Sequence, residues 1–278
     1  GERRVTYTVD EGDRVRIQKI QFKGNTVFGD WRLRWSMKKT AQSNLFSRFL
    51  KHDIFNPATA REDLDKVRDL YRSVGYKNAV ISDPEIEVRA LNPNAATAKD
   101  KKRRLFLTVP VEEGQRFKFG EISIEGNKTY TDEQLLRAFR RHSGGWLRAK
   151  LVSEGVEKIT DQYKNTGFIE ANVNTELKER DGGFADVIVH VNEGEQYRVG
   201  RIEFNGNTRT HDKVLRRELR VQEGMLLNIA GIKNSVYKVE QLQYFRPDKN
   251  DPVEFANVDS QTKTVDLVYK GEEADRTE

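Results

Sequence analysis

The side chains that could perform catalysis or bind a metal ion are scattered along the chain. The four histidines show no HExxH spacing, and the sequence contains no GxSxG, P-loop or Rossmann glycine pattern. The absence of cysteine excludes disulfides, thiol nucleophiles and Cys-ligated zinc. Carboxylates are abundant, but small modules offer no deep pocket in which their pKa would shift. We therefore expect no enzyme activity, no metal and no cofactor. The histidines are His52, His142, His190 and His211.

Composition points to small packed cores and a solvated, mixed-charge surface. Of the 278 residues, 36% are hydrophobic and 33% are charged, which argues against a disordered chain. Basic residues exceed acidic ones by 49 to 44, but both are interspersed rather than gathered in a stripe. An RNA-binding repeat protein is the alternative from another class. Such a protein requires aromatic side chains on an exposed sheet face, where bases can stack on them. The aromatic residues of the predicted strands here instead occupy the alternate positions that face the core. We expect no nucleic-acid partner.

The strongest signal is an internal repeat. Three segments align without gaps and share a Gly-Asn pair one residue before their end. In each segment apolar residues alternate, slip by one position at Gln18, Gly120 or Gly200, and alternate again. One extra residue in a strand restores both halves to the same face, so we predict a β-bulge at each slip. The segments are VRIQKIQFKGNT at 15–26, FKFGEISIEGNK at 117–128 and YRVGRIEFNGNT at 197–208.

Two helices and two strands are expected after each Gly-Asn pair. The first helix begins with a plausible capping box at 131–134, or at Asp30 and Asp212 in the other copies. The second carries a 3.6-residue apolar stripe, is capped near Thr59 in the first copy, and ends at Gly75-Tyr76 and Gly167-Phe168. The third copy lacks this glycine before Tyr244-Phe245, so we expect a less regular helix end, stopped by Pro247. The strand pairs are 78–89 with 104–112, 171–179 with 185–194, and 253–258 with 263–270.

This order predicts an α+β chain of three tandem βααββ modules. Each module is expected to be a three-stranded mixed sheet covered on one face by two helices, and the modules to form an elongated arm. The expected divisions are the last strand of a preceding module at 1–12, modules at 13–114, 115–194 and 195–272, and a linker at 273–278.

The first module is longer by two insertions, at 40–56 and 91–104. The first insertion, with Leu45, Phe46 and Phe49 among basic residues, either extends the core over the helices or touches membrane or client. The second is expected to be a loop with a solubilising basic run.

The Gly-Asn turn after a bulged strand, the Gly-aromatic helix end and the Glu-Gly after the last strand together resemble polypeptide-transport-associated (POTRA) domains. VLRRELRVQEGMLL at 214–227 is similar to the barrel-proximal module of BamA-type assembly factors. The resemblance implies a periplasmic receptor and scaffold attached to the outer membrane through a C-terminal barrel absent from this chain. It also implies two kinds of partner, unfolded outer-membrane proteins and accessory assembly lipoproteins. The alternative is the POTRA arm of a two-partner secretion transporter that recognises one dedicated exported protein.

The edges of the predicted sheets are the candidate client-binding sites. An edge strand has unpaired N–H and C=O groups, to which an extended chain can add by main-chain hydrogen bonds with little sequence specificity. The family resemblance implies that the second strand of each module is the available edge. The alternative is a merely solvated edge, blunted by Pro84 and by charge. The candidates are Asn78, Ala79, Val80, Ile81, Glu85, Ile86, Glu87, Val88, Ala171, Asn172, Val173, Asn174, Thr175, Glu176, Leu177, Val253, Glu254 and Phe255.

The charged first helix of the third module is the second candidate. Its buried residues are expected to be Leu215 and Leu219, so its charged side chains face water. A solvated helix face explains them without any partner. The resemblance implies an accessory-lipoprotein dock, and we name Arg216 and Glu223 as its candidates.

Overall fold

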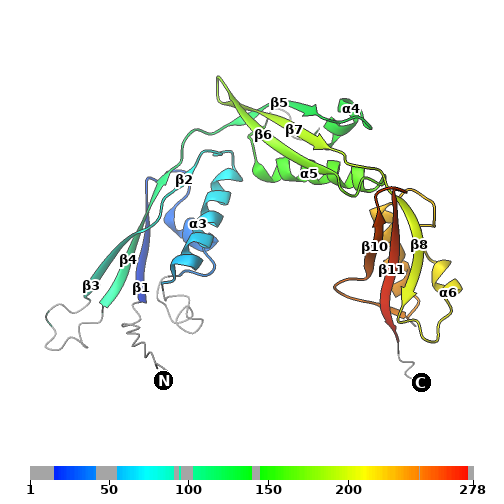
Figure 1. Cartoon of the computed structure of the whole chain (residues 1–278). Coiled ribbons are helices and arrows are strands. Elements are labelled where there is room, and N and C mark those ends of the chain that lie inside the picture. Colours follow the sequence, from blue (N-terminus) through cyan, green and yellow to red (C-terminus); the bar gives the residue numbers. More distant parts are fainter. Residues whose placement is uncertain are drawn as a thin grey trace, which may run out of the picture. The chain divides into compact units, whose positions relative to one another are not determined.

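Three sheet-and-helix modules follow one another along the chain in the computed structural model of Figure 1. The structure describes residues 16–41, 55–90, 94, 103–139, 145–243 and 245–274. The sheets are mixed: in the third module, for example, β8 (Arg198–Asn205) runs parallel to its neighbour β11 (Thr264–Glu273), while β10 (Val253–Asp259) runs antiparallel to β11. The predicted α+β class and the tandem βααββ modules are confirmed. The predictions for residues 1–12, for most of 40–56 and 91–104, and for His142 and Tyr244 fall outside the described residues.

In the first module the last strand, β4, is the central strand of the sheet. The sheet order is β1, β4, then β2 and β3, which both pair with β4. Asn56, and not Thr59, caps the second helix, because its side chain accepts the N–H of Ala58 and Pro57 occupies the first helical turn. Its elements are β1 (Arg16–Lys23), α1 (Asp30–Ser36), α3 (Pro57–Arg72), β2 (Val80–Ile81), β3 (Glu85–Ala90) and β4 (Arg103–Glu112).

The second module has the most regular sheet, in the order β5, β7, β6. The predicted capping box is present, since Thr131 and Gln134 exchange side-chain and backbone hydrogen bonds at the start of α4. Gly155 is required in the second helix because any Cβ there would lie 2.0 Å from the Phe139 ring. Its elements are β5 (Lys118–Glu125), α4 (Asp132–Leu136), the 3-10 turn η1 (Arg137–Phe139), α5 (Ala149–Lys164), β6 (Asn172–Arg180) and β7 (Phe184–Asn192).

The third module adds a strand that the sequence pattern did not predict. Its helix ends at Glu240 and Gln243 adopts a φ of 62°, which takes over the left-handed turn that glycine makes in the other copies. Pro247 does not stop the helix as expected but belongs to β9, which pairs with the end of β11. Its elements are β8 (Arg198–Asn205), α6 (Asp212–Arg216), α7 (Ile229–Glu240), β9 (Phe245–Pro247), β10 (Val253–Asp259) and β11 (Thr264–Glu273).

The predicted bulges are present where the strand ladders define them. The register of β1 with β4 shifts at Gln18, and that of β8 with β11 shifts around Gly200. In the third module the Asp266 carboxylate accepts the N–H of Arg201, 2.6 Å away, and a Cβ at Gly200 would lie 2.2 Å from that carboxylate. The second module repeats this contact with Asp186 and Glu121. A glycine therefore allows an aspartate to satisfy the extra amide of the bulge.

A glutamate carboxylate holds the Gly-Asn turn in every module, and in the second module it is buried. In the second module Glu193 accepts the N–H groups of Lys128 and Thr129, at 2.6 and 2.8 Å, and the hydroxyl of Tyr163 at 2.8 Å. Burial opposes ionisation of Glu193, but these donors outweigh it and hold its pKa below the usual range. Glu113 accepts the two equivalent N–H groups in the first module, and Glu273 accepts the N–H groups of Arg209 and Thr210, one position further along, in the third. The recurring Glu after the last strand is therefore the partner of the recurring turn.

The described contacts group into two compact units, residues 1–118 with 145–149, and 119–144 with 150–278. Within the second unit, the carbonyl of Gly167 accepts the N–H of Tyr197, 2.9 Å away. The carboxamide oxygen of Asn165 accepts the N–H of Ala230 at 2.8 Å, in the first turn of α7. Ile169 packs against the core of the third module. Residues of the third module thus donate hydrogen bonds to the turn that follows α5.

Candidate functional site

The second strand of each module lies at an outer edge of its sheet, and these three edges differ. β6 has the longest regular edge: Asn172 to Arg180 pair in unbroken register with Asn192 to Phe184 of β7. Among the described strands, β7 is its only sheet neighbour. The connecting turn uses Gly182 and Gly183 at φ of 84° and 78°, as the predicted hairpin requires. The other side of β6 therefore presents a straight run of backbone groups.

The side chains of β6 leave this edge accessible. Val173 is buried and Leu177 is half-buried on the helix-covered face, while Thr175 between them is exposed. Residues on the opposite face are exposed and polar, including Asn174 and Glu176. Ala171, which we predicted as part of the edge, is not in the strand. It is buried, and its N–H is bound to the carbonyl of Phe168 in the turn after α5.

The edge of the first module is interrupted. β2 contains only Val80 and Ile81, and β3 resumes at Glu85 after Pro84, as the proline predicted. Asn78 and Ala79 precede the strand, and the N–H of Ala79 bonds to the carbonyl of Tyr76, so these two predicted edge positions are wrong. Along β3, Ile86 and Val88 are 50% and 54% exposed. They lie opposite buried Leu107 and Leu105 of β4, so β3 extends its apolar face beyond the helix cover. Glu87 forms an ion pair with Arg89 there.

The edge of the third module is distorted by a bulge. The register of β10 with β11 breaks between Ala256 and Asp259, where Asn257 has a φ of 45°. The Asn257 carboxamide donates to Asp266 at 3.0 Å and fixes the distortion. Glu254 is bound to the ammonium of Lys270 at 2.7 Å. Val253 is buried and Phe255 is exposed on the helix-covered face. Only the first half of β10 is a regular strand edge.

The opposite edge of the third sheet, β8, is closed by the chain itself. Val199 donates to the carbonyl of Met225 at 2.8 Å, and its own carbonyl accepts the N–H of Gly224 at 2.7 Å. Further along, the N–H of Ile202 donates to the Glu223 carboxylate at 2.9 Å. The strand edge is therefore already satisfied by the segment that follows α6.

Arg216 and Glu223, the predicted docking residues, are brought together on this closed edge. Their side chains form an ion pair at 3.0 Å, and the Arg216 guanidinium also donates to the carbonyl of Ile202. The N–H of Ile202 and the guanidinium hold the pKa of Glu223 below its usual range. Both side chains remain 40% or more exposed. They are accessible to a partner while they cover the β8 edge.

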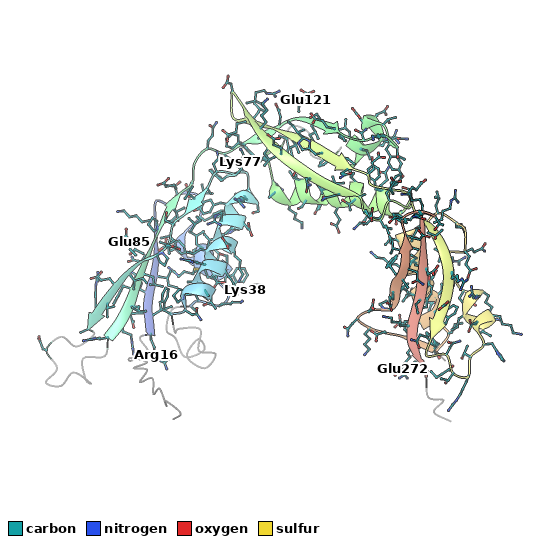
Figure 2. All side chains as sticks on the ribbon, in the orientation of Figure 1. Arg16, Lys38, Lys77, Glu85, Glu121 and Glu272 are labelled. Atoms are coloured by element: carbon teal, nitrogen blue, oxygen red, sulfur yellow. The ribbon has the colours of Figure 1, made fainter. Side chains whose placement is uncertain are left out.

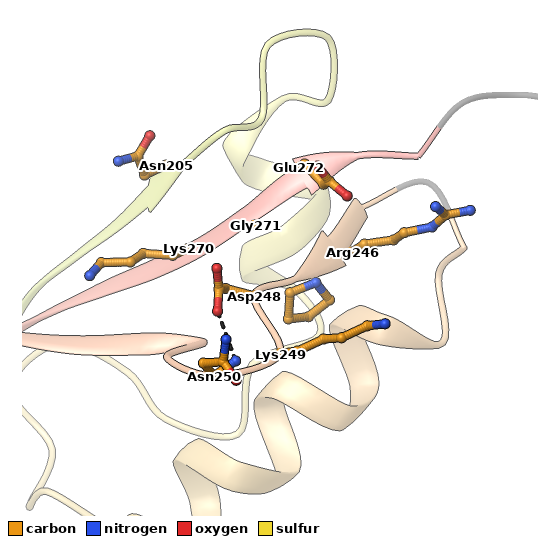
Figure 3. Close-up of a pocket in the computed structure, with 9 residues that line it drawn as sticks. Asn205, Arg246, Asp248, Lys249, Asn250, Lys270, Gly271 and Glu272 are labelled. Atoms are coloured by element: carbon orange, nitrogen blue, oxygen red, sulfur yellow. Dashed lines mark hydrogen bonds between the residues drawn. The ribbon is translucent and has the colours of Figure 1, made fainter.

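A hollow lies in the third module, beside β9 and the end of β11. Its volume is about 630 Å³, and Figure 3 shows Arg246, Asp248, Lys249 and Glu272 around it. The Asp248 carboxylate accepts the N–H groups of Asn250 and Asp251, at 2.8 and 3.0 Å, which lowers its pKa. This acid is therefore engaged in holding the turn before β10.

The two described histidines, His190 and His211, belong to different modules. His190 lies on β7 between Glu125 and Glu176, with nitrogen–oxygen distances of 3.4 and 3.5 Å. Within the described ranges, no three His, Asp or Glu side chains are grouped so that they could hold a metal ion. No described helix combines the length and the apolar character that a bilayer crossing needs.

Comparisons with known proteins identify the repeat. The family model described as "POTRA: Surface antigen variable number repeat" matches residues 15–114, 117–194 and 197–274. The outer membrane protein assembly factor BamA of Neisseria meningitidis is 28% identical over 254 residues, 91% of this chain and 30% of that protein. A putative outer membrane protein assembly factor of Treponema pallidum is 26% identical over 274 residues, 97% of this chain and 30% of that protein. The chain thus spans less than a third of these relatives.

A solved structure shows the same fold. The crystal structure of POTRA domains 3–5 of Haemophilus influenzae BamA matches with a TM-score of 0.65 and 22% identity, and the match covers 95% of this chain and all of that one. Its three modules correspond in number to the three modules here.

Proposed function

The chain belongs to the POTRA family, and on that premise we propose that it is the periplasmic scaffold part of an outer-membrane protein assembly factor. Its role is to receive unfolded outer-membrane proteins by strand addition and to dock accessory assembly lipoproteins. The proposed partners are bound through surfaces, so the chain acts as a scaffold and not as an enzyme. The membrane attachment is a barrel that would follow this segment in the whole protein.

The observation that carries the proposal is the nine-residue edge of β6. Backbone groups of a strand edge can pair with any extended chain, so they suit a receiver of many different clients. An unfolded barrel protein is rich in segments that will become strands, with apolar residues at alternate positions. On β6, such a segment would place its apolar side chains beside Leu177, on the helix-covered face. Its polar side chains would lie beside Asn174 and Glu176 on the solvated face.

The three edges would contribute unequally to this capture. β3 adds an exposed apolar face at Ile86 and Val88, but Pro84 and the missing strand residues shorten its edge. β10 offers Val253, Glu254 and Phe255 before its bulge. We therefore place the main client site on β6 and weaker extensions of it on β3 and β10.

Accessory lipoproteins are proposed to dock at Arg216 and Glu223. The pair presents one charge of each sign on an accessible surface, which gives a partner two complementary contacts. A partner that takes over either side chain also competes with its bond to Ile202 of β8. Docking would then break hydrogen bonds by which Arg216 and Glu223 cover the β8 edge.

Strand addition can be tested without altering the protein, by modifying the client. Peptides with the alternating pattern of a barrel strand are titrated into the isotope-labelled chain, and the amide shifts of β6 are followed. Because only one edge of an added strand forms hydrogen bonds, N-methylation of one set of alternate peptide amides should abolish binding. N-methylation of the other set, the matched control, should leave binding intact. Equal effects of the two sets would rule out strand addition, and shifts confined to helix residues would place the client elsewhere.

A further inference from the structure

Two tryptophans are exposed on the first helix of the first module. Trp31 and Trp35 on α1 are 67% and 83% exposed, and Val27 is exposed just before the helix. Residues four apart lie on the same helix face, so the two rings form one surface. Leu33, between them in sequence, is fully buried and points into the core. We call Val27, Trp31 and Trp35 the tryptophan patch.

The other two modules show that the fold does not need this patch. Alignment of the Gly-Asn pairs places Glu133 and Lys213 at the position of Trp31, and Arg137 and Arg217 at that of Trp35. Glu133 and Arg137 form an exposed ion pair at 3.4 Å. The residues equivalent to Leu33, Leu135 and Leu215, are both fully buried. The core position is therefore shared by the three modules, whereas tryptophans at these two exposed helix positions are particular to the first.

Basic residues surround the tryptophan patch. Between Asp30 and Lys39 there are four basic residues and one acidic residue. Arg34 is paired with Asp30, and Lys39 with Glu62. Neither Arg32 nor Lys38 has a carboxylate partner in the part of the chain that the structure describes. Figure 2 marks Lys38 on the helix side of the module, and Glu85 on the strand side.

We propose that the tryptophan patch, together with Arg32 and Lys38, binds the surface of an anionic lipid bilayer. Tryptophan rings favour the boundary between headgroups and acyl chains, because one part of the ring is apolar and its N–H is polar. Nearby ammonium and guanidinium groups attract anionic headgroups. The surface lies on a helix and not on a strand edge, so it does not compete with strand addition. It goes beyond the proposed function and does not depend on it.

The choice of a bilayer over a peptide rests on the form and charge of the surface. The patch is a short helix face with two neighbouring rings, and beside them lie Arg32 and Lys38, which form no ion pair with any described residue. A bilayer offers a continuous surface that accepts both rings and both charges at once. Because the contact is small, we expect weak, reversible and salt-sensitive binding.

The test uses the full 278-residue chain and vesicles of equal parts phosphatidylglycerol and phosphatidylcholine. The double variant W31E/W35R places at these positions the residues that form the ion pair Glu133–Arg137 in the second module, and it leaves the net charge unchanged. We expect it to lower vesicle binding at least about tenfold in sedimentation, with an unchanged circular dichroism spectrum. The matched control is Tyr237→Ser, which removes an exposed aromatic ring from α7 and should leave binding unchanged.

Two further measurements keep the proposal testable if the double variant folds poorly. Brominated lipids should quench the tryptophan emission of the unaltered chain, and Lys38→Glu should weaken binding and reduce its dependence on salt. Equal binding to pure phosphatidylcholine vesicles would overturn the proposal, as would unchanged binding of W31E/W35R. Tryptophans already shielded from acrylamide without vesicles would show that the protein itself covers the patch. Self-association lost in W31E/W35R would identify a second copy as the occupant. Either result would also overturn it.

Discussion

β6 and β10 occupy the same place in two copies of one fold, yet they present different edges. Both are outer strands that pair with the central strand of their sheet. β6 keeps its register over all nine residues, whereas β10 loses it at Asn257 and binds Lys270 through Glu254. Topology therefore determines which strand is at the edge, and local side chains determine whether that edge can accept another strand.

The two modules also differ in how firmly the turn beside the sheet is held. Glu193 accepts a tyrosine hydroxyl in addition to its backbone donors. For Glu273, the described contacts are with Arg209 and Thr210. The second module thus combines the more regular edge with the more completely satisfied core carboxylate.

The largest expected effect on stability comes from removing the Glu193 carboxylate. Glu193→Ala should lower the free energy of unfolding of the second module by about 3 kcal/mol, because buried donors lose their acceptor. Glu273→Ala should cost the third module about 1 kcal/mol, because its carboxylate is more exposed. Amide exchange of β7 and β11 reports the two modules separately. Equal losses would contradict the difference that we draw between them.

Acid should weaken the same interaction. The folded-state pKa of Glu193 is lowered, so its contribution is complete above the usual glutamate pKa of about 4.3 and is lost as the pH falls through the lower folded value. Melting of the second module should therefore shift to lower temperature as the pH falls below about 4.3. Glu193→Gln should flatten this dependence in calorimetry. A variant with the slope of the unaltered chain would assign the acid sensitivity to other groups.

Client affinity should distinguish the two edges directly. Thr175→Lys places a charge at an exposed position on the helix-covered face of β6, where the apolar side chains of a client would lie, and should weaken binding of a barrel-strand peptide by about tenfold. Phe255→Lys, the matched change on β10, should weaken it less than about twofold. Isothermal titration with the same peptide measures both affinities. A larger loss in the β10 variant would reverse our ranking of the edges.

The smallest expected effect is at the closed β8 edge. Glu223→Gln should change the free energy of unfolding by less than about 1 kcal/mol, since the Arg216 pair is largely exposed. It should nevertheless reduce co-purification of an accessory lipoprotein with the chain. Lys213→Gln on α6, the helix that carries Arg216, is the control, and it should retain the partner. Full retention by both variants would remove the docking proposal.

The repeat allowed much of the fold to be predicted. The bulge at Gln18 and the capping box at Thr131 depend on local sequence, and both are present. β9 was missed because three residues carry no periodic signal, and its partner is the distant end of β11. Asp63 was also missed. It is fully buried and accepts the N–H groups of Lys38, Lys39 and Thr40, a loop that only the folded chain brings near.

The candidate site was predictable only in outline. The position of the edge strands follows from the repeat, but the loss of Asn78, Ala79 and Ala171 from the edge depends on turn hydrogen bonds. The pairing of Arg216 with Glu223 crosses a seven-residue separation and depends on the path of the chain after α6. Neither feature has a local sequence signal.

Amide hydrogen exchange along β6 and β10, with and without a barrel-strand peptide, tests the central claim most directly. If clients add to the open edge, alternate amides of β6, those facing away from β7, should gain protection in the complex. Amides of β10 beyond Asn257 should change little. Protection that rises equally on both strands, or only on the helices, would contradict the claim that β6 is the receiving edge.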